Sequence, residues 1–164
     1  MKIFLIGYMA CGKSRAGRML AATSGKHFID LDKYIEIRER RSVHEIFRDD
    51  GEDRFRKLES AYLREVCSLN SDFVMSCGGG TPCFNSNMEY MNSEGITVFL
   101  NTSADVIVER LARRRHRRPL VEKLSDEELR VYVQKHLSER MPYYVKAHIT
   151  LESAEMLTAE NLKL

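Results

Sequence analysis

Short apolar runs alternate along the chain with longer segments in which apolar residues recur every three or four positions. A short apolar run bounded by glycine or polar residues is typical of a buried strand, and the longer spacing is typical of a helix that packs on one face. Five runs predict strands: residues 2–7, 27–31, the stretch FVMS before Gly78, 96–101 and 148–152.

The segments between these runs predict helices, several of them with recognisable start and stop signals. Ser42 and Glu45 have the spacing of a capping box, and Gly51 ends the short helix that they begin. The other predicted helices are SRAGRMLAATS before Gly25, residues 32–40, 53–69, a segment from about 103, a segment capped by Ser125, and the closing LTAENLKL. Alternating strands and helices predict an α/β fold, a parallel sheet covered by helices on both faces in three layers.

Length and composition place the chain among ordinary globular proteins. Its 164 residues suit a single domain spanning 1–164, and 43% of them are hydrophobic while 30% are charged. The formal net charge is only +2, so the molecule as a whole is not built to bind a polyanion. Any strongly basic function has to be local.

Cysteine usage and the apolar N-terminal run bear on location. The four cysteines form no CxxC pair and show no metal-type spacing with histidine. The opening apolar run is interrupted at Gly7 and is too short to cross a membrane. We therefore expect free thiols, a cytoplasmic location and no membrane partner.

The stretch GYMACGKS, residues 7–14, lies between the first predicted strand and the first predicted helix. Gly7 and Gly12 let the backbone turn tightly and approach a ligand, and the exposed amides at a helix start favour an anion. Lys13 adds a charge that reaches the β- and γ-phosphates, and the Ser14 hydroxyl can bind Mg²⁺. The stretch therefore predicts a binding site for a nucleoside triphosphate.

A second group of residues is expected at the same edge of the sheet, where ligands of open parallel sheets collect. Asp30 and Asp32 leave the second strand, and two carboxylates with this spacing point the same way on an extended segment. One could hold Mg²⁺ through water, and the other could accept a hydrogen bond from a substrate hydroxyl. The alternative is a solvated turn with two capping aspartates.

A run of three glycines and two arginines completes this group. Gly78, Gly79 and Gly80 follow the third strand, where ordering glycine is entropically costly unless a small ligand lies against the backbone. Arg56 and Arg140 could form forked contacts with a carboxylate, although each alone could be a surface residue.

Together these motifs resemble one family, shikimate kinase, along nearly the whole chain. The resemblance rests on the order and spacing of GYMACGKS, DLD, DGEDRFRKLE, CGGGTP, RRPL and ERMPYY. It implies a P-loop kinase fold with strand order 2-3-1-4-5 and a mobile lid of about 112–124. It also implies ATP-dependent phosphorylation of the 3-hydroxyl of shikimate, towards chorismate and the aromatic amino acids, by a monomer.

The resemblance also implies roles for single residues. Lys13 and Ser14 hold phosphates and Mg²⁺, and Asp30 supports the metal through water. Asp32 binds the shikimate hydroxyls and takes the proton, in an acceptor region of about 32–60. The residues that it implies for ATP are Gly7, Ala10, Cys11, Gly12, Lys13, Ser14, Arg15, Arg110 and Arg118.

On the acceptor side, the resemblance implies that Arg56 and Arg140 grip the shikimate carboxylate while Gly78 to Gly80 line the pocket. Arg118 belongs to the lid and is the third residue, with Lys13 and Asp32, expected to act in catalysis. Arg110 corresponds to an arginine that stacks on adenine. The chain departs from the family at Arg15, where threonine is common, and at Cys11, where a small residue is usual.

Three other functions fit parts of the sequence. Another small-molecule kinase, acting on gluconate or a nucleotide, would share GYMACGKS and a lid arginine. The arginine-rich segment 110–119 could neutralise nucleic-acid phosphates, but no aromatic residues that would stack on bases are interleaved there, so we expect no nucleic-acid partner. A nucleotide-dependent regulatory module would not need the paired aspartates and arginines.

Overall fold

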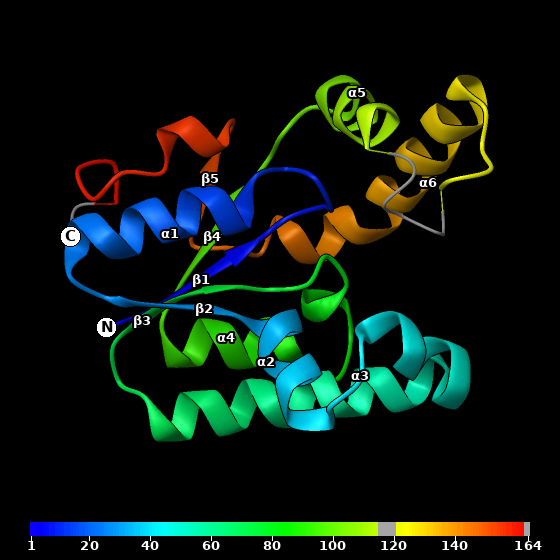
Figure 1. The fold of residues 1–164 in the computed structure, drawn as a ribbon. Helices are drawn as coiled ribbons and strands as arrows, with labels where there is room; N and C mark the ends of the chain where they lie inside the picture. Colours follow the sequence, from blue (N-terminus) through cyan, green and yellow to red (C-terminus); the bar gives the residue numbers. More distant parts are fainter. Residues whose placement is uncertain (115–120, 163–164) are drawn as a thin grey trace.

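The computed structural model describes residues 1–114 and 121–162 and contains a five-stranded parallel sheet with order β2-β3-β1-β4-β5 (Figure 1). The strands are β1 (Lys2–Ile6), β2 (His27–Asp30), β3 (Phe73–Ser76), β4 (Ile96–Leu100) and β5 (Ile149–Leu151). All neighbouring strands pair in parallel. The strand positions, the parallel sheet and the strand order expected from the sequence are confirmed.

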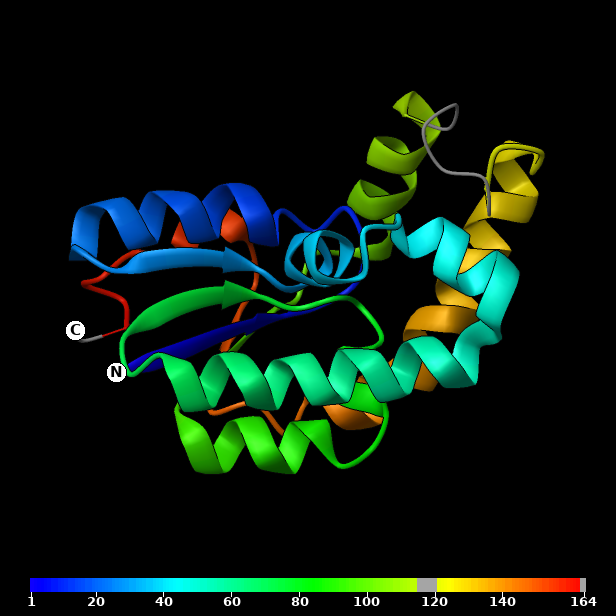
Figure 2. The same cartoon turned by 60° about the horizontal axis from the view of Figure 1, so that its bottom comes forward.

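Helices lie on both faces of this sheet, as Figure 2 shows with α1 on one side and α3 and α4 on the other. The helices are α1 (Lys13–Ser24), α2 (Leu31–Glu39), α3 (Val43–Leu69), α4 (Asn87–Glu94), α5 (Ala104–Arg113) and α6 (Asp126–Tyr144), with short 3₁₀ turns η1 (Thr81–Cys83) and η3 (Ala154–Met156). Helices α5 and α6 contact each other at the end of the sheet where the strands finish (Figure 1).

The central strand β1 divides the core into two parts, because alternate side chains of a strand face opposite sides. Phe4 and Ile6 join the larger cluster, which also takes in residues of α3, α4 and α6. Ile3 and Leu5 join the smaller cluster under α1. All four side chains are fully buried, which explains why the strand reads as a continuous apolar run rather than an alternating one.

Helix α3 contains both features predicted from its sequence, a capping box at its start and a break at a glycine. Ser42 and Glu45 form the capping box, with the Ser42 hydroxyl accepting from the Glu45 amide. Gly51, at φ 82° and ψ 169°, breaks the helical geometry, so the helix consists of two segments that meet at this residue. The second segment carries Arg56 and Glu59 into the interior of the molecule.

Two parts of the chain differ from what the sequence indicated. Helix α4 was not predicted, because only Met88 and Met91 mark its buried face and its first residue follows Ser86 without a side-chain cap. The predicted closing helix does not form over the described part of LTAENLKL, since residues 159–162 make only turns after η3. Leu157 and Leu162 are both buried in the smaller core cluster, so packing rather than helix propensity sets this segment.

Candidate active site

The loop between β1 and α1 has the backbone geometry of a phosphate-binding loop. Gly7 has φ 141°, and a Cβ there would lie 2.8 Å from the carbonyl oxygen of Leu100, so only glycine fits. Gly12 and Ala10 also have positive φ, 102° and 60°. Ala10 therefore holds a left-handed conformation that is unusual for a residue with a side chain and is often found at binding sites.

Lys13 folds back over this loop and is almost completely buried. Its Nζ donates to the carbonyl oxygens of Gly7 at 2.7 Å and Tyr8 at 2.8 Å. These two bonds hold the ammonium group at the centre of the loop, where phosphate oxygens are expected. Cys11 is buried in the smaller core cluster, and its sulfur also lies 3.5 Å from Lys13 Nζ, beneath the loop.

Ser14 stands at the start of α1 and is joined to the ends of two other strands. Its hydroxyl donates to Asp30 Oδ2 at 2.9 Å and lies 3.1 Å from the Ser76 hydroxyl oxygen. Asp30 ends β2 and caps α2, where its other carboxylate oxygen accepts from the Lys33 amide at 3.3 Å. The start of α1 and the ends of β2 and β3 thus bring oxygen atoms to one point beside the phosphate-binding loop.

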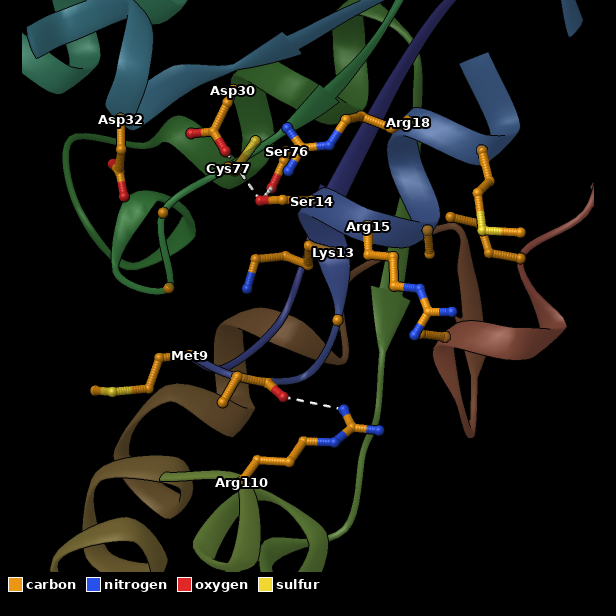
Figure 3. A pocket seen from close by; sticks show the side chains of 18 of the residues that line it. Met9, Lys13, Ser14, Arg15, Arg18, Asp30, Asp32, Ser76, Cys77 and Arg110 are labelled. Carbon is orange, nitrogen blue, oxygen red and sulfur yellow. Dashed lines mark hydrogen bonds between the residues drawn. The ribbon is translucent and has the colours of Figure 1, made fainter. Parts of the chain in front are cut away.

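Asp32 is not on an extended segment, as the spacing of the two aspartates had indicated. Because Asp30 is the cap, Asp32 already lies in the first turn of α2, where a carboxylate is favoured by the helix dipole. Both side chains still face the same space as Lys13 and Ser14 (Figure 3). Burial, with repulsion from Glu59 and Asp30, raises the pKa of Asp32 to about 6, and Lys13 opposes this shift.

These groups surround a cavity of about 760 Å³ at the carboxyl ends of the strands (Figure 3). The predicted site residues that line it are Ala10, Gly12, Lys13, Ser14, Arg15, Asp30, Asp32, Gly78, Gly79 and Arg110. The same cavity is also lined by Met9, Arg18, Ser76 and Thr158, which the sequence did not single out.

The three glycines after β3 leave room for functional side chains. A Cβ on Gly78 would lie 2.9 Å from Glu59 Oε1 and 3.1 Å from Asp32 Oδ1. A Cβ on Gly79 would lie 2.8 Å from Arg140 Nη1, and one on Gly80 would overlap the Arg56 guanidinium. None of the three has a positive φ. Their lack of side chains therefore serves close approach rather than backbone conformation.

Arg56 is buried and held by carboxylates of its own helix. Its Nη1 donates to Glu59 Oε2 at 2.9 Å, and its Nη2 donates to Glu52 Oε1 at 3.1 Å. Glu59 is completely buried and also accepts from the Thr81 hydroxyl, which fixes it on η1. The guanidinium lies over the Phe84 ring at 4.3 Å. Arg56 is thus presented in one orientation beside Gly80.

Arg140 approaches the neighbouring glycine from the opposite element, α6. One turn further on, the Tyr144 hydroxyl donates to the Gly79 carbonyl oxygen at 2.6 Å and ties α6 to the glycine run. Tyr144 is fully buried, and burial raises its pKa, so it remains a neutral donor at physiological pH. The two predicted carboxylate-binding arginines therefore meet at adjacent glycines, although they come from positions far apart in the sequence.

The other side of the cavity carries the residues expected to contact the nucleotide. Arg110 Nη1 donates to the Ala10 carbonyl oxygen at 3.0 Å, which anchors α5 to the phosphate-binding loop (Figure 3). Arg15, the residue in place of the common threonine, points towards η3 (Figure 3). Arg118 lies outside the described residues, as do residues 115–120 of the predicted lid.

Several contributors to this site were missed from the sequence, and only some left a signal there. Glu59 lies three residues after Arg56, a spacing that lets the two side chains meet on one helix face. Tyr144 lies four residues after Arg140 on α6 and could have been grouped with it in the same way. Ser76 and Thr81 act through tertiary contacts that no local pattern announces.

All four cysteines are free thiols, as expected. Within residues 1–114 and 121–162, no helix combines the length and apolar character that a membrane span requires.

Comparison with known proteins agrees with the sequence motifs. A family model described as shikimate kinase matches residues 9–162. A shikimate kinase of Parabacteroides distasonis is 44% identical over 161 residues, covering 98% of this chain and 92% of that protein.

Solved structures agree as well. The structure of a shikimate kinase from Bacteroides thetaiotaomicron is 40% identical, with a TM-score of 0.92 and coverage of 100% of this chain and 99% of that one. A shikimate kinase from Acinetobacter baumannii, solved in complex with shikimate, is 32% identical, with a TM-score of 0.87 and coverage of 99% of this chain and 90% of that one. The chain belongs to the shikimate kinase family.

Proposed function

We propose that this protein transfers the γ-phosphoryl group of ATP to the 3-hydroxyl of shikimate, giving shikimate 3-phosphate and ADP. The observation that carries the proposal is the glycine run, around which Asp32, Arg56 and Arg140 converge beside the phosphate-binding loop. A base and two guanidinium groups suit the hydroxyl and the carboxylate of a hydroxy acid. Family membership decides against the alternative of a gluconate or nucleotide kinase.

On the donor side, the amides of residues 10–14 and the Lys13 ammonium provide the positive field for the phosphates. Lys13 already points into the loop through two carbonyl contacts, and a phosphate oxygen would take the place of one of them. Arg110 and Arg15 line the wall where the rest of the nucleotide is expected.

The residues near Ser14 fit a magnesium ion. Hard cations of this kind prefer oxygen ligands and usually take only one or two from the protein, the rest coming from phosphates and water. Ser14 offers its hydroxyl directly, and Asp30, 2.9 Å away, is placed to hold a water ligand. When bound, Mg²⁺ supplies charge neutralisation on the transferring phosphoryl group.

On the acceptor side, Arg56 and Arg140 bind the carboxylate and so fix the ring, while Asp32 receives the hydroxyl. In the transfer step, the acceptor oxygen forms a bond to the γ-phosphorus as the bond to the bridging oxygen of ADP breaks. The hydroxyl proton passes to Asp32, whose pKa of about 6 leaves it ionised at neutral pH yet basic enough to accept it.

The remaining features of the proposal rest on the family resemblance. Residues 1–164 form one kinase domain in which 32–60 bind the acceptor and 112–124 form a lid. Arg118 in that lid meets the γ-phosphoryl group. The protein works as a monomer in the cytoplasm, a location that its four free thiols support.

An ADP-release assay with a panel of acceptors tests the proposal. The panel contains shikimate, its methyl ester, gluconate and nucleoside monophosphates, each at saturating Mg·ATP. We expect turnover with shikimate, and phosphorus NMR should place the new phosphate on the 3-oxygen. Turnover with gluconate or a nucleotide, in the absence of turnover with shikimate, would contradict the proposal.

A further inference from the structure

A polar pair lies behind Arg140, between α6 and the phosphate-binding loop. Tyr8, the residue after Gly7, is buried, and its hydroxyl lies 3.1 Å from His136 Nδ1. The Arg140 guanidinium lies over the Tyr8 ring, with its central carbon 5.5 Å from the ring centre. His136 and Arg140 are four residues apart on α6 and therefore share one face of the helix.

The ring of Tyr8 packs against the imidazole of His136, which is itself held by a second aromatic ring. His136 meets it edge-on, with ring centres 5.7 Å apart and planes at 82°. Tyr132, one turn before His136 on α6, also packs against the imidazole, with ring centres 5.2 Å apart. The Tyr8 ring can therefore present a fixed aromatic face to Arg140, an arrangement that attracts a guanidinium.

The charges around His136 favour a neutral imidazole. Burial lowers the pKa of His136, and the charges of Arg140 and Arg56 lower it further, while the charges of Glu139 and Glu52 act in the opposite direction. A neutral ring can accept a hydrogen bond from the Tyr8 hydroxyl at Nδ1 and carry its own hydrogen on Nε2. The hydrogen bond therefore places no second positive charge beside Arg140.

We infer that Tyr8 and His136 are positioning residues that hold Arg140 against Gly79 for the carboxylate of the acceptor. The inference rests on the proposed function, since it assigns Arg140 to a substrate carboxylate. It also links the two halves of the site. The Tyr8 carbonyl holds Lys13 at 2.8 Å on the phosphate side, while the Tyr8 ring supports Arg140 on the acceptor side.

The pair predicts an effect that depends on the acceptor charge. Tyr8→Leu removes the aromatic face, and from the usual strength of a cation–π contact we expect the KM for shikimate to rise about tenfold. Tyr8→Phe keeps the face and loses the hydrogen bond, so the rise should be about threefold. In both variants the KM for shikimate methyl ester and the KM for ATP should change less than about twofold, because neither depends on the guanidinium.

Variants at His136 provide the second series. His136→Leu should raise the KM for shikimate about threefold, since it removes the acceptor for the Tyr8 hydroxyl. His136→Asn should restore most of the affinity, because the asparagine oxygen can take the place of Nδ1. Lys135→Ala, at an exposed position of the same helix, is the matched control and should behave as wild type. Arg140→Lys alters the carboxylate-binding residue itself, so its rise in the KM for shikimate is the largest expected in the series.

Each outcome decides the inference. A rise in KM that is equal for shikimate and its ester, or a comparable rise in the KM for ATP, would show a merely structural role and overturn it. If the wild-type enzyme is active, unchanged kinetics in the two Tyr8 variants and the two His136 variants would also overturn the inference. Should Tyr8→Leu fail to fold, the half-buried His136 series still decides. A wild-type enzyme without turnover of shikimate would overturn the proposed function as well.

Discussion

The variant Asp32→Asn should be more stable than the wild-type protein and should lose most of its activity. Burial, with repulsion from Glu59 and Asp30, raises the pKa of Asp32 from 3.8 to about 6. A folded-state pKa above the unfolded value means that the ionised carboxylate destabilises the fold at neutral pH. Asp32→Asn keeps the shape of the side chain and removes this charge.

The magnitude follows from the shift of about two pKa units, each worth about 1.4 kcal/mol, so the ceiling is about 3 kcal/mol. Asp32 keeps partial contact with solvent, which screens the charge, so we expect a gain of about 1–2 kcal/mol. In a chain of 164 residues this corresponds to a rise in Tm of about 3–6 °C at pH 8.

The pH dependence of this gain identifies its origin. The penalty is complete above the folded-state pKa of about 6, decreases as the pH falls, and disappears below the unfolded value of 3.8. Thermal unfolding of wild type and Asp32→Asn at pH 8, 6 and 4 should therefore give converging values of Tm. Turnover with shikimate should fall by about 10²–10⁴ if Asp32 takes the proton.

Asp72→Asn is the matched control, because this exposed carboxylate has its pKa lowered by hydrogen bonds from Lys26 and the N-terminal amine. Its replacement should not raise Tm at pH 8. The reasoning about burial would be refuted if Asp32→Asn were no more stable than wild type at pH 8, or if its advantage were the same at pH 4. Near-normal turnover would remove Asp32 from catalysis.

Three further predictions concern the rest of the site. Ser14→Ala should weaken use of Mg·ATP far more than shikimate binding, and an unchanged Mg²⁺ dependence of turnover would contradict the metal assignment. Glu59→Leu leaves the buried Arg56 without its main partner and should cost about 3 kcal/mol in urea unfolding, so an unchanged midpoint would show that the pair is dispensable. Arg118→Ala should reduce turnover at saturating substrates at least about a hundredfold, whereas Arg114→Ala should have little effect, and similar modest losses in both would indicate a diffuse positive field.

The fold could be predicted from the sequence because its signals are local and mutually consistent. Each strand is a short apolar run, and most helices carry a cap or a glycine at their ends. Helix α4 was not predicted, because Met88 and Met91 alone give its sequence too little helical periodicity. Its stability comes from the core that it covers. The closing segment was wrongly predicted as a helix, because burial of Leu157 and Leu162 outweighs its helix propensity.

The site was only partly predictable. Lys13, Ser14 and the glycines follow from motif and position, since the ends of parallel strands must meet. The conformation at Asp32 did not follow, because the boundary between β2 and α2 falls between the two aspartates and places Asp32 in a helix. The supports of the arginines, such as Thr81 for Glu59 and Tyr8 for Arg140, depend on contacts between distant segments that a single sequence does not specify.

The glycine run also limits how this enzyme could escape an inhibitor. A compound seated on Gly78 to Gly80 would touch backbone alone at those positions. Any side chain added there would collide with Glu59, Arg140 or Arg56, so a mutation that displaces the compound would also disturb the acceptor site proposed above. Selection for resistance to such a compound should therefore return changes elsewhere in the protein, or greater expression of the unaltered gene.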